Sequence, residues 1–378
     1  MNIRVLPLFL TFFLMGIADA MGPLSSAVAS SPFMAALMPF FVFIAFAVFS
    51  VPGGILAARI GKQKLLVLGL VLCTVALGVP TFFDPPFPFL LAAIFLLGVG
   101  TTFLQVAGNP IMRDISREGD YSRNLSLAQG IKGVGSAVSS YFVTAVTTIT
   151  FFAAMGWRGA FPVFFVLMGI ALISVTLLKI KETQAEIPPG VLMSLELLKE
   201  PEVALSVIGI FLYVGAEVCM ATFLKPVLIS FQFSEKSAAV LGPSMFFGAL
   251  TVGRLIAGSV KLDPYRAFKL SALAGQISLI ALVSGVKVLL IPSILMAGLG
   301  FANIWPMLFS ITVEEKPGRS SELSGLMCMA ISGGAVVPLL MGGLGGGERA
   351  LPFIVPALCF TYLTFLAVKK VGRREMAK

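Results

Sequence analysis

The sequence is divided into long apolar stretches by short charged breaks, and this pattern leaves few folds open to it. Only 12% of the residues are charged and 58% are hydrophobic, whereas a soluble domain carries roughly twice that charged share. A membrane-spanning helix needs about 20 apolar residues. We therefore expect an all-α integral membrane protein with twelve transmembrane helices, at 5–29, 33–58, 63–83, 87–111, 124–151, 159–178, 203–230, 237–260, 266–286, 288–312, 321–344 and 350–369.

The basic residues are distributed unevenly between the breaks. With the N-terminus in the cytoplasm, the extracytoplasmic breaks hold only Arg158, Lys236, Lys287 and Arg349. Cytoplasmic loops carry an excess of Lys and Arg, so the pattern predicts both termini in the cytoplasm and an even number of spans. It also accounts for the net charge of +9 without a nucleic-acid partner. The alternative is a secretory signal ending at Ala18-Asp19-Ala20, which would leave eleven spans.

The longest polar break runs from Lys179 to Glu202 and divides the spans equally. It contains Pro188-Pro189-Gly190 and then a short amphipathic run at 191–198. We expect a six-helix bundle over 1–180, a cytoplasmic linker over 181–202 and a second six-helix bundle over 203–378.

Three ionisable residues, Asp19, Lys132 and Glu217, lie inside apolar stretches. A charge at the bilayer centre costs at least ~2.5–3.5 kcal/mol on insertion scales, so it indicates a substrate path, an ion path or a pairing partner. A carboxyl group in a low dielectric can bind and lose a proton near neutral pH, which makes Asp19 and Glu217 candidates for proton coupling. Lys132 can either bind an anionic solute or compete with the proton for a carboxylate.

Residues suited to catalysis or metal binding are scarce in the sequence. It has no histidine, none of its four cysteines is in a CxxC pair, and no P-loop is present. These features disfavour histidine catalysis, metal sites and ATP as the energy source. We expect no cofactor and no metal, and a protein that is not an enzyme.

The break after the second span runs from Gly54 through Arg59 to Gly61-Lys62-Gln63-Lys64, with glycines for a tight turn and basic residues for the cytoplasmic face. It resembles a loop signature of the major facilitator superfamily. Ala58 stands where the signature usually has an aspartate. That replacement weakens the charge lock that the resemblance implies for the outward-open state.

Further segments are similar to the fucose/glucose/galactose:proton symporter branch of that superfamily. They are Leu104-Gln105-Val-Ala-Gly108-Asn109-Pro110, Asn124-Leu-Ser126-Leu-Ala128-Gln129-Gly-Ile-Lys132, Tyr213-Val-Gly-Ala-Glu217, the segment 248–254, Asn303 with Pro306, and the segment 332–338. The resemblance implies two bundles that rock against each other around a midplane site. Four positions depart from the branch: Asp19 comes about one turn early, Gln105 replaces an acid of the fucose type, Ser126 stands where asparagine is usual, and Lys132 replaces an asparagine.

Amide and aromatic side chains are suited to a polyhydroxy solute. Gln105 and Asn109 are four residues apart on one helix face, and Gln129 and Lys132 are three apart on another. The predicted substrate-binding residues are Gln105, Asn109, Gln129, Lys132, Asn303, Trp305 and Tyr213. Packing between helices is the alternative role for the amides and for Trp305.

The sequence thus predicts a secondary active transporter that imports a sugar or sugar-like solute by proton symport, as a monomer in the plasma (bacterial inner) membrane. Two alternatives keep the same fold: a permease for a sugar acid or organic anion that uses Lys132, and a sodium-coupled sugar transporter.

Overall fold

The computed structural model describes residues 6–17, 32–146, 154–183, 190–344 and 351–376. Within these ranges the regular structure is helical and no strand occurs. The described part of the chain forms two compact units. Unit 1 comprises Met1–Arg117, Ile131–Glu196 and Lys316–Met329, and unit 2 comprises Glu118–Gly130, Leu197–Glu315 and Ala330–Lys378.

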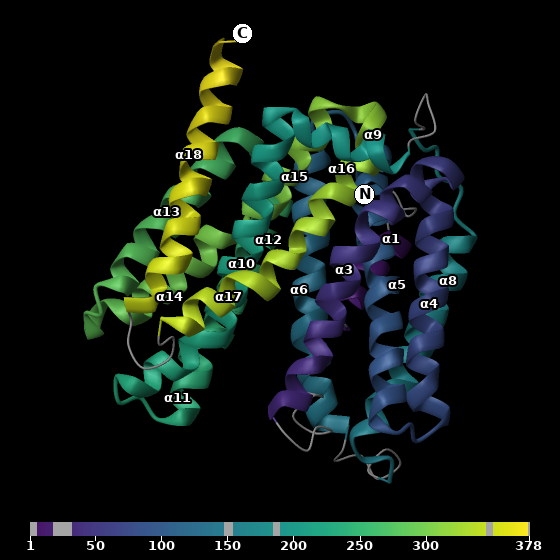
Figure 1. Ribbon diagram of the computed structural model, residues 1–378, viewed down its shortest axis with the longest axis horizontal. Coiled ribbons are helices and arrows are strands. Elements are labelled where there is room, and N and C mark those ends of the chain that lie inside the picture. Colours follow the sequence, from purple (N-terminus) through teal and green to yellow (C-terminus); the bar gives the residue numbers. More distant parts are fainter. Residues whose placement is uncertain (1–5, 18–31, 147–153, 184–189, 345–350, 377–378) are drawn as a thin grey trace. The chain divides into compact units, whose positions relative to one another are not determined.

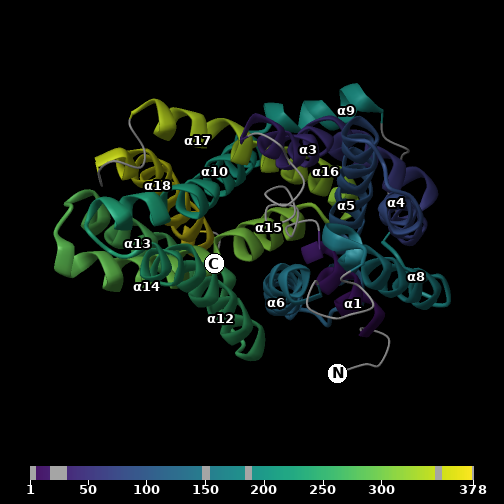
Figure 2. The same cartoon turned by 90° about the horizontal axis from the view of Figure 1, so that it is seen from below.

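Unit 1 is built around four long helices of the N-terminal half. They are α3 (Pro32–Ile60), α4 (Lys62–Phe82), α5 (Phe87–Ile115) and α8 (Phe161–Thr176), which follows the 3₁₀ turn Gly156–Ala160. Helices α4, α5 and α8 lie side by side in both Figure 1 and Figure 2, and α3 packs on α5. The unit also contains α1 (Leu6–Met15), the linker helix α9 (Val191–Glu196) and α16 (Ser320–Met329).

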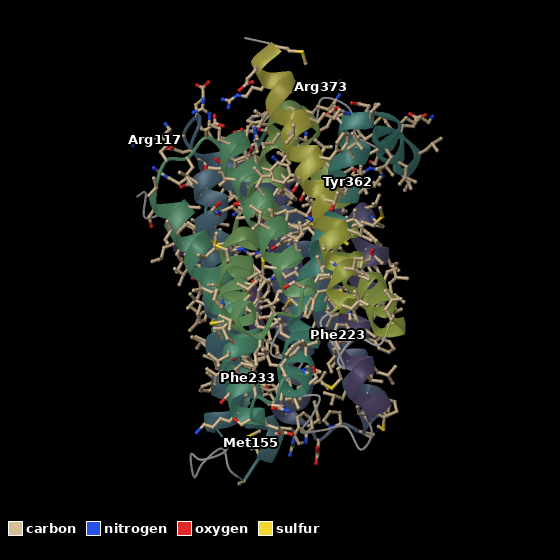
Figure 3. The ribbon with its side chains drawn as sticks, turned by 90° about the vertical axis from the view of Figure 1, so that its left-hand side faces the viewer. Arg117, Met155, Phe223, Phe233, Tyr362 and Arg373 are labelled. Atoms are coloured by element: carbon tan, nitrogen blue, oxygen red, sulfur yellow. The ribbon has the colours of Figure 1, made fainter. Side chains whose placement is uncertain are left out.

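Unit 2 contains most of the C-terminal half. Its helices are α10 (Pro201–Ser230), α11 (Glu235–Ala239), α12 (Met245–Ser259), α13 (Pro264–Val283), α14 (Lys287–Ala302), α15 (Ile304–Glu315), α17 (Gly333–Gly343) and α18 (Ile354–Met376). Helices α13, α14 and α18 lie side by side in both views. Tyr362, labelled part-way along α18 in Figure 3, donates a hydrogen bond of 2.9 Å to the Leu205 carbonyl of α10.

One helix, α6, and the eleventh predicted span are divided between the units, so the units do not coincide with the predicted halves. The first turns of α6 (Tyr121–Val146) belong to unit 2, where Leu127 packs against Gly258. Helix α16, from the start of the eleventh predicted span, belongs to unit 1, where it packs on α3. The division of the chain at its linker stays a prediction.

Ten helical segments of the described residues are long and apolar enough to cross a membrane. They match ten of the twelve predicted spans, which confirms the all-α membrane class but not the count. The fifth predicted span corresponds to α6, a helix of 26 residues that is not among the ten. The first predicted span, 5–29, runs beyond the described residues after Ile17.

Glycine allows two matched helix crossings. A Cβ built on Gly135 of α6 would lie 2.0 Å from the Phe13 carbonyl oxygen of α1, and one on Gly333 of α17 would lie 2.0 Å from that of Phe211 on α10. Phe13 and Phe211 are separated by the same number of residues as Gly135 and Gly333. The first and fifth spans therefore cross as the seventh and eleventh do, as expected of an internal repeat.

Candidate substrate and coupling site

The predicted site residues lie in both units. Gln105, Asn109 and Lys132 belong to unit 1, and Gln129, Tyr213, Glu217, Asn303 and Trp305 belong to unit 2. Asp19 lies outside the described residues.

In unit 2 the tenth predicted span is broken at Asn303. Helix α14 ends at Ala302 and α15 starts at Ile304, and Asn303 has φ −103° and ψ 1°. In a continuous helix the Ala302 carbonyl would accept from the N–H four residues later, but that residue is Pro306, which has none. The Arg254 side chain of α12 takes that place and donates from Nε to the Ala302 oxygen at 3.1 Å. Arg254 is only 7% exposed, so the break in the helix fixes a buried cation.

That cation meets two predicted site residues of α10. Arg254 Nη2 donates to the Tyr213 hydroxyl at 3.1 Å and lies 3.8 Å from the Glu217 carboxylate. Tyr213 and Glu217 are one turn apart, so both reach the same guanidinium. The separation of 3.8 Å is an ion pair without a hydrogen bond, and the Tyr213 hydroxyl is a second neighbour of the Glu217 carboxylate.

Two buried polar atoms beside the helix break have no partner among the described residues. They are Oδ1 of Asn303, an acceptor, and Nε1 of Trp305, a donor. Buried polar atoms in native proteins nearly always have partners, so such a pair needs an explanation. A hydroxyl group can donate to the one and accept from the other. The Trp305 ring is 3% exposed and packs against Phe309 with centroids 5.6 Å apart.

In unit 1 the polar stripe of α5 is buried. Gln105 and Asn109 are 4% and 0% exposed, and Oε1 of Gln105 has no partner among the described residues. Asn109 Nδ2 lies 4.0 Å from Sγ of Cys328 on α16. The stripe thus combines one unsatisfied amide oxygen with one amide in contact with a thiol.

Pro110 explains a second contact of α16 with this stripe. It leaves the Val106 carbonyl without its helical donor. The Ser324 hydroxyl donates to that carbonyl oxygen at 2.8 Å, and both atoms are buried. Ser324 and Cys328 are one turn apart on α16, so a single face of α16 contacts α5 at the predicted substrate-binding residues.

Lys132 lies on α6 in the same unit and is half-buried. Its ammonium group interacts electrostatically with the Cys328 thiol. Cys328, a residue of the eleventh predicted span, therefore lies beside two predicted site residues, Asn109 and Lys132. Gln129 is 3% exposed, and its predicted role stays a prediction.

Sequence reasoning missed two kinds of functional neighbour. Arg254, at the end of the segment 248–254, was interpreted as a gate or an interfacial anchor and not as a binding residue, and Ser324 and Cys328 were not singled out as site residues. The signal for Arg254 and Ser324 was present in Pro306 and Pro110, because each proline leaves a carbonyl that needs an outside donor. The sequence does not state which side chain supplies the donor.

A family model of the Major Facilitator Superfamily matches residues 6–367. The chain belongs to the Major Facilitator Superfamily. Since the proteins it resembles are transporters of that superfamily, the prediction that it is not an enzyme is confirmed.

Individual relatives agree with the predicted branch. The chain is 29% identical over 352 residues to the "Glucose/galactose transporter" of Brucella abortus biovar 1 (strain 9-941). This alignment covers 87% of the chain and 83% of the relative. Its fold is similar to that of the transporter FucP in the outward conformation, at 16% identity, a TM-score of 0.83 and coverage of 97% and 98%. It is also similar to the proton:xylose symporter XylE, at 14% identity, a TM-score of 0.78 and coverage of 97% and 94%.

Proposed function

We propose that the chain imports a hexose or a similar neutral sugar together with a proton. The observation that carries this proposal is the ion pair of the buried Arg254 and the half-buried Glu217, in which Arg254 is hydrogen-bonded to Tyr213 and borders the broken tenth span. The name of the Brucella relative supports a hexose, and the names of the proton:xylose symporter XylE and of the fucose:proton symporter FucP support a symporter.

The geometry gives each residue a role in the proposed cycle. Proton binding to Glu217 removes its charge and weakens the pairing with Arg254, which keeps its hydrogen bonds to Tyr213 and Ala302. Asn303 and Trp305 offer the acceptor and the donor that a sugar hydroxyl needs. Gln105 and Asn109 of α5 stay proposed substrate-binding residues on sequence grounds. Asp19 stays a proposed second proton site on sequence grounds alone.

Uptake into proteoliposomes tests this proposal. With an imposed pH gradient, the wild type accumulates labelled D-galactose or D-glucose, and Glu217→Gln loses gradient-driven accumulation because its amide cannot bind and release a proton. Exchange of sugar across the membrane without a gradient persists, since the solute contacts remain. Accumulation by Glu217→Gln at the wild-type level contradicts the assignment. Accumulation that follows an imposed sodium gradient instead supports the sodium-coupled alternative.

A sugar acid or organic anion is the second candidate solute. Lys132 favours an anionic solute, because its ammonium group is within electrostatic range of Cys328, and Cys328 in turn contacts Asn109 of α5. Lys132→Asn should then shift the ratio of uptake from galacturonate toward galactose by about tenfold or more, as expected for the loss of a buried charge pair of at least ~1.4 kcal/mol. An unchanged ratio argues for the neutral sugar.

We further propose that the protein has twelve spans in two six-helix halves, that both termini lie in the cytoplasm, and that it acts as a monomer in the bacterial inner membrane. The excess of basic residues in alternate breaks supports the orientation. Reporter fusions at 150, 185 and the C-terminus test it, because only the first should report the extracytoplasmic side.

A further inference from the structure

Helix α16 is packed tightly on α3. A Cβ built on Gly54 would lie 2.6 Å from the Ser321 carbonyl oxygen, and one on Gly325 would lie 2.8 Å from that of Ser50. Helix α16 comes from the C-terminal sequence half and α3 from the N-terminal half. If the halves move during transport, as the proposed function requires, this contact has to open and close.

The linker helix α9 is hydrogen-bonded to the start of α16. Ser194 of α9 donates from Oγ to Glu322 at 3.0 Å, and Arg319 Nη2 donates to the Met193 carbonyl at 2.9 Å. Ser194 is 1% and Glu322 3% exposed. Helix α9 packs on α3 as well as on α16, so it bridges the two helices.

Glu322 is the centre of this contact. Arg319 donates to both of its carboxylate oxygens, at 2.9 and 2.6 Å, in the forked geometry that is strongest between these groups. Glu322 also lies in the first turn of α16, where the helix dipole favours a negative charge. A buried carboxylate held by three hydrogen bonds has few alternative positions, so it fixes where α9 sits on α16.

The last turn of α3 has no carboxylate. Ala58 occupies the place of the aspartate in the loop signature and has no charge. We propose that Glu322, held by Arg319 and Ser194, is a positioning residue of the transport cycle, and that it latches α16 to α3 through the linker helix α9. The proposal rests on movement of the two halves but not on the identity of the solute or the ion.

Cys328 provides a reporter for this latch. It lies on α16, has no exposed surface and contacts Asn109, so an alkylating reagent reaches it only when α16 leaves α5. Cys73 is equally buried but lies between α4 and α5, with Sγ 3.8 Å from the Leu97 carbonyl. We would prepare the full-length chain in two single-cysteine forms, one retaining Cys328 and one retaining Cys73, and measure labelling by N-ethylmaleimide in membranes without solute or gradient.

Ser194→Ala and Glu322→Gln should each raise the labelling rate of Cys328 about tenfold, as expected when a buried hydrogen bond to a charged group is lost. The labelling rate of Cys73 should not change. Glu315→Gln is the matched control, because Glu315 accepts a hydrogen bond from Lys370 at 3.1 Å and both residues belong to unit 2. It should leave both rates unchanged.

Two results overturn the latch. The first is an unchanged rate for Cys328 in both variants. The second is a parallel rise for Cys73, which means that the variants loosen unit 1 as a whole. Neither result bears on sugar uptake by the wild type, so the latch and the proposed function fail or succeed separately.

Discussion

Proline explains two polar contacts that are central to the candidate site. Pro110 and Pro306 each leave a buried carbonyl without its helical donor, and the chain supplies the Ser324 hydroxyl for one and the Arg254 guanidinium for the other. An unsatisfied buried carbonyl costs about 1–3 kcal/mol. Each donor therefore stabilises a helix that contains a proline. Each also lies beside a predicted binding residue, since Arg254 contacts Tyr213 and Ser324 contacts the residue after Gln105.

A double-mutant cycle tests the role of Arg254. Arg254→Ala should destabilise the protein by about 3–5 kcal/mol, because it leaves the half-buried Glu217 without its cation and the Ala302 carbonyl without a donor. Glu217→Gln in that background should restore part of the loss, with a coupling energy on the order of 1–3 kcal/mol. Thermal unfolding in detergent measures both. Strict additivity of the two substitutions would mean that the pair does not interact.

At the scale of helices, close crossings depend on single glycines. Gly135→Ala and Gly333→Ala should each destabilise the protein by several kcal/mol, because the new Cβ meets a backbone oxygen that cannot move aside without displacing a helix. Gly169→Ala and Gly248→Ala are matched controls, since no atom lies within 4 Å of the added Cβ in either case. Their unfolding temperatures should equal or exceed that of the wild type. Similar losses in all four variants would contradict the crossings.

The start of α13 is predicted to be sensitive to pH. Partial burial acts to raise the pKa of the Asp263 carboxyl, but the Arg374 side chain and the Arg266 N–H outweigh it, so the pKa lies below its ordinary value. The carboxylate therefore stabilises the protein above its unfolded pKa of about 3.9, and this stabilisation is lost as the pH falls through the lower folded value.

Two substitutions separate the charge of Asp263 from its capping role. The side chain also caps α13 by accepting from the Arg266 N–H at 3.0 Å. Asp263→Asn should lower the unfolding temperature at neutral pH, with the difference from wild type shrinking below pH 4. Asp263→Ser keeps a cap and loses the charge, so it should show the same loss of pH dependence. A difference from wild type that is constant with pH would rule out the carboxylate as its cause.

At the scale of the whole molecule, the compact units exchange segments between the sequence halves. The start of α6 packs on α12, and α16 packs on α3. Neither half alone contains a complete unit. We expect the fragments 1–189 and 190–378 to be degraded when expressed singly and to restore sugar uptake when expressed together. A single fragment that is monodisperse and unfolds cooperatively would show that these exchanged contacts are dispensable.

The membrane class and ten of the spans could be predicted from the sequence because each depends on local composition, and the candidate residues, chosen by spacing along one helix, stay predictions. Runs of apolar residues define spans, and an interval of four residues places Gln105 and Asn109 on one face. The partners of Arg254 and Ser324 could not be predicted in this way, because they depend on which helices become neighbours. Local composition is a less clear guide for α6. This helix has 26 residues, but Lys132 and the polar residues around it lower its hydropathy, so it is not among the ten apolar segments.

The two proline-freed carbonyls differ in where their donors originate. The donor to Ala302 comes from the same sequence half, so the kink of the tenth span keeps its support throughout any movement of the halves. The donor to Val106 comes from α16, of the opposite half, and leaves when α16 leaves. Ser126 occupies the position in α6 that Ser324 occupies in the repeat, and its hydroxyl is buried without a partner among the described residues. If the halves move during transport, as proposed, we expect one half to stay rigid at its proline kink and the other to lose a hydrogen bond at the polar stripe of α5 in each cycle.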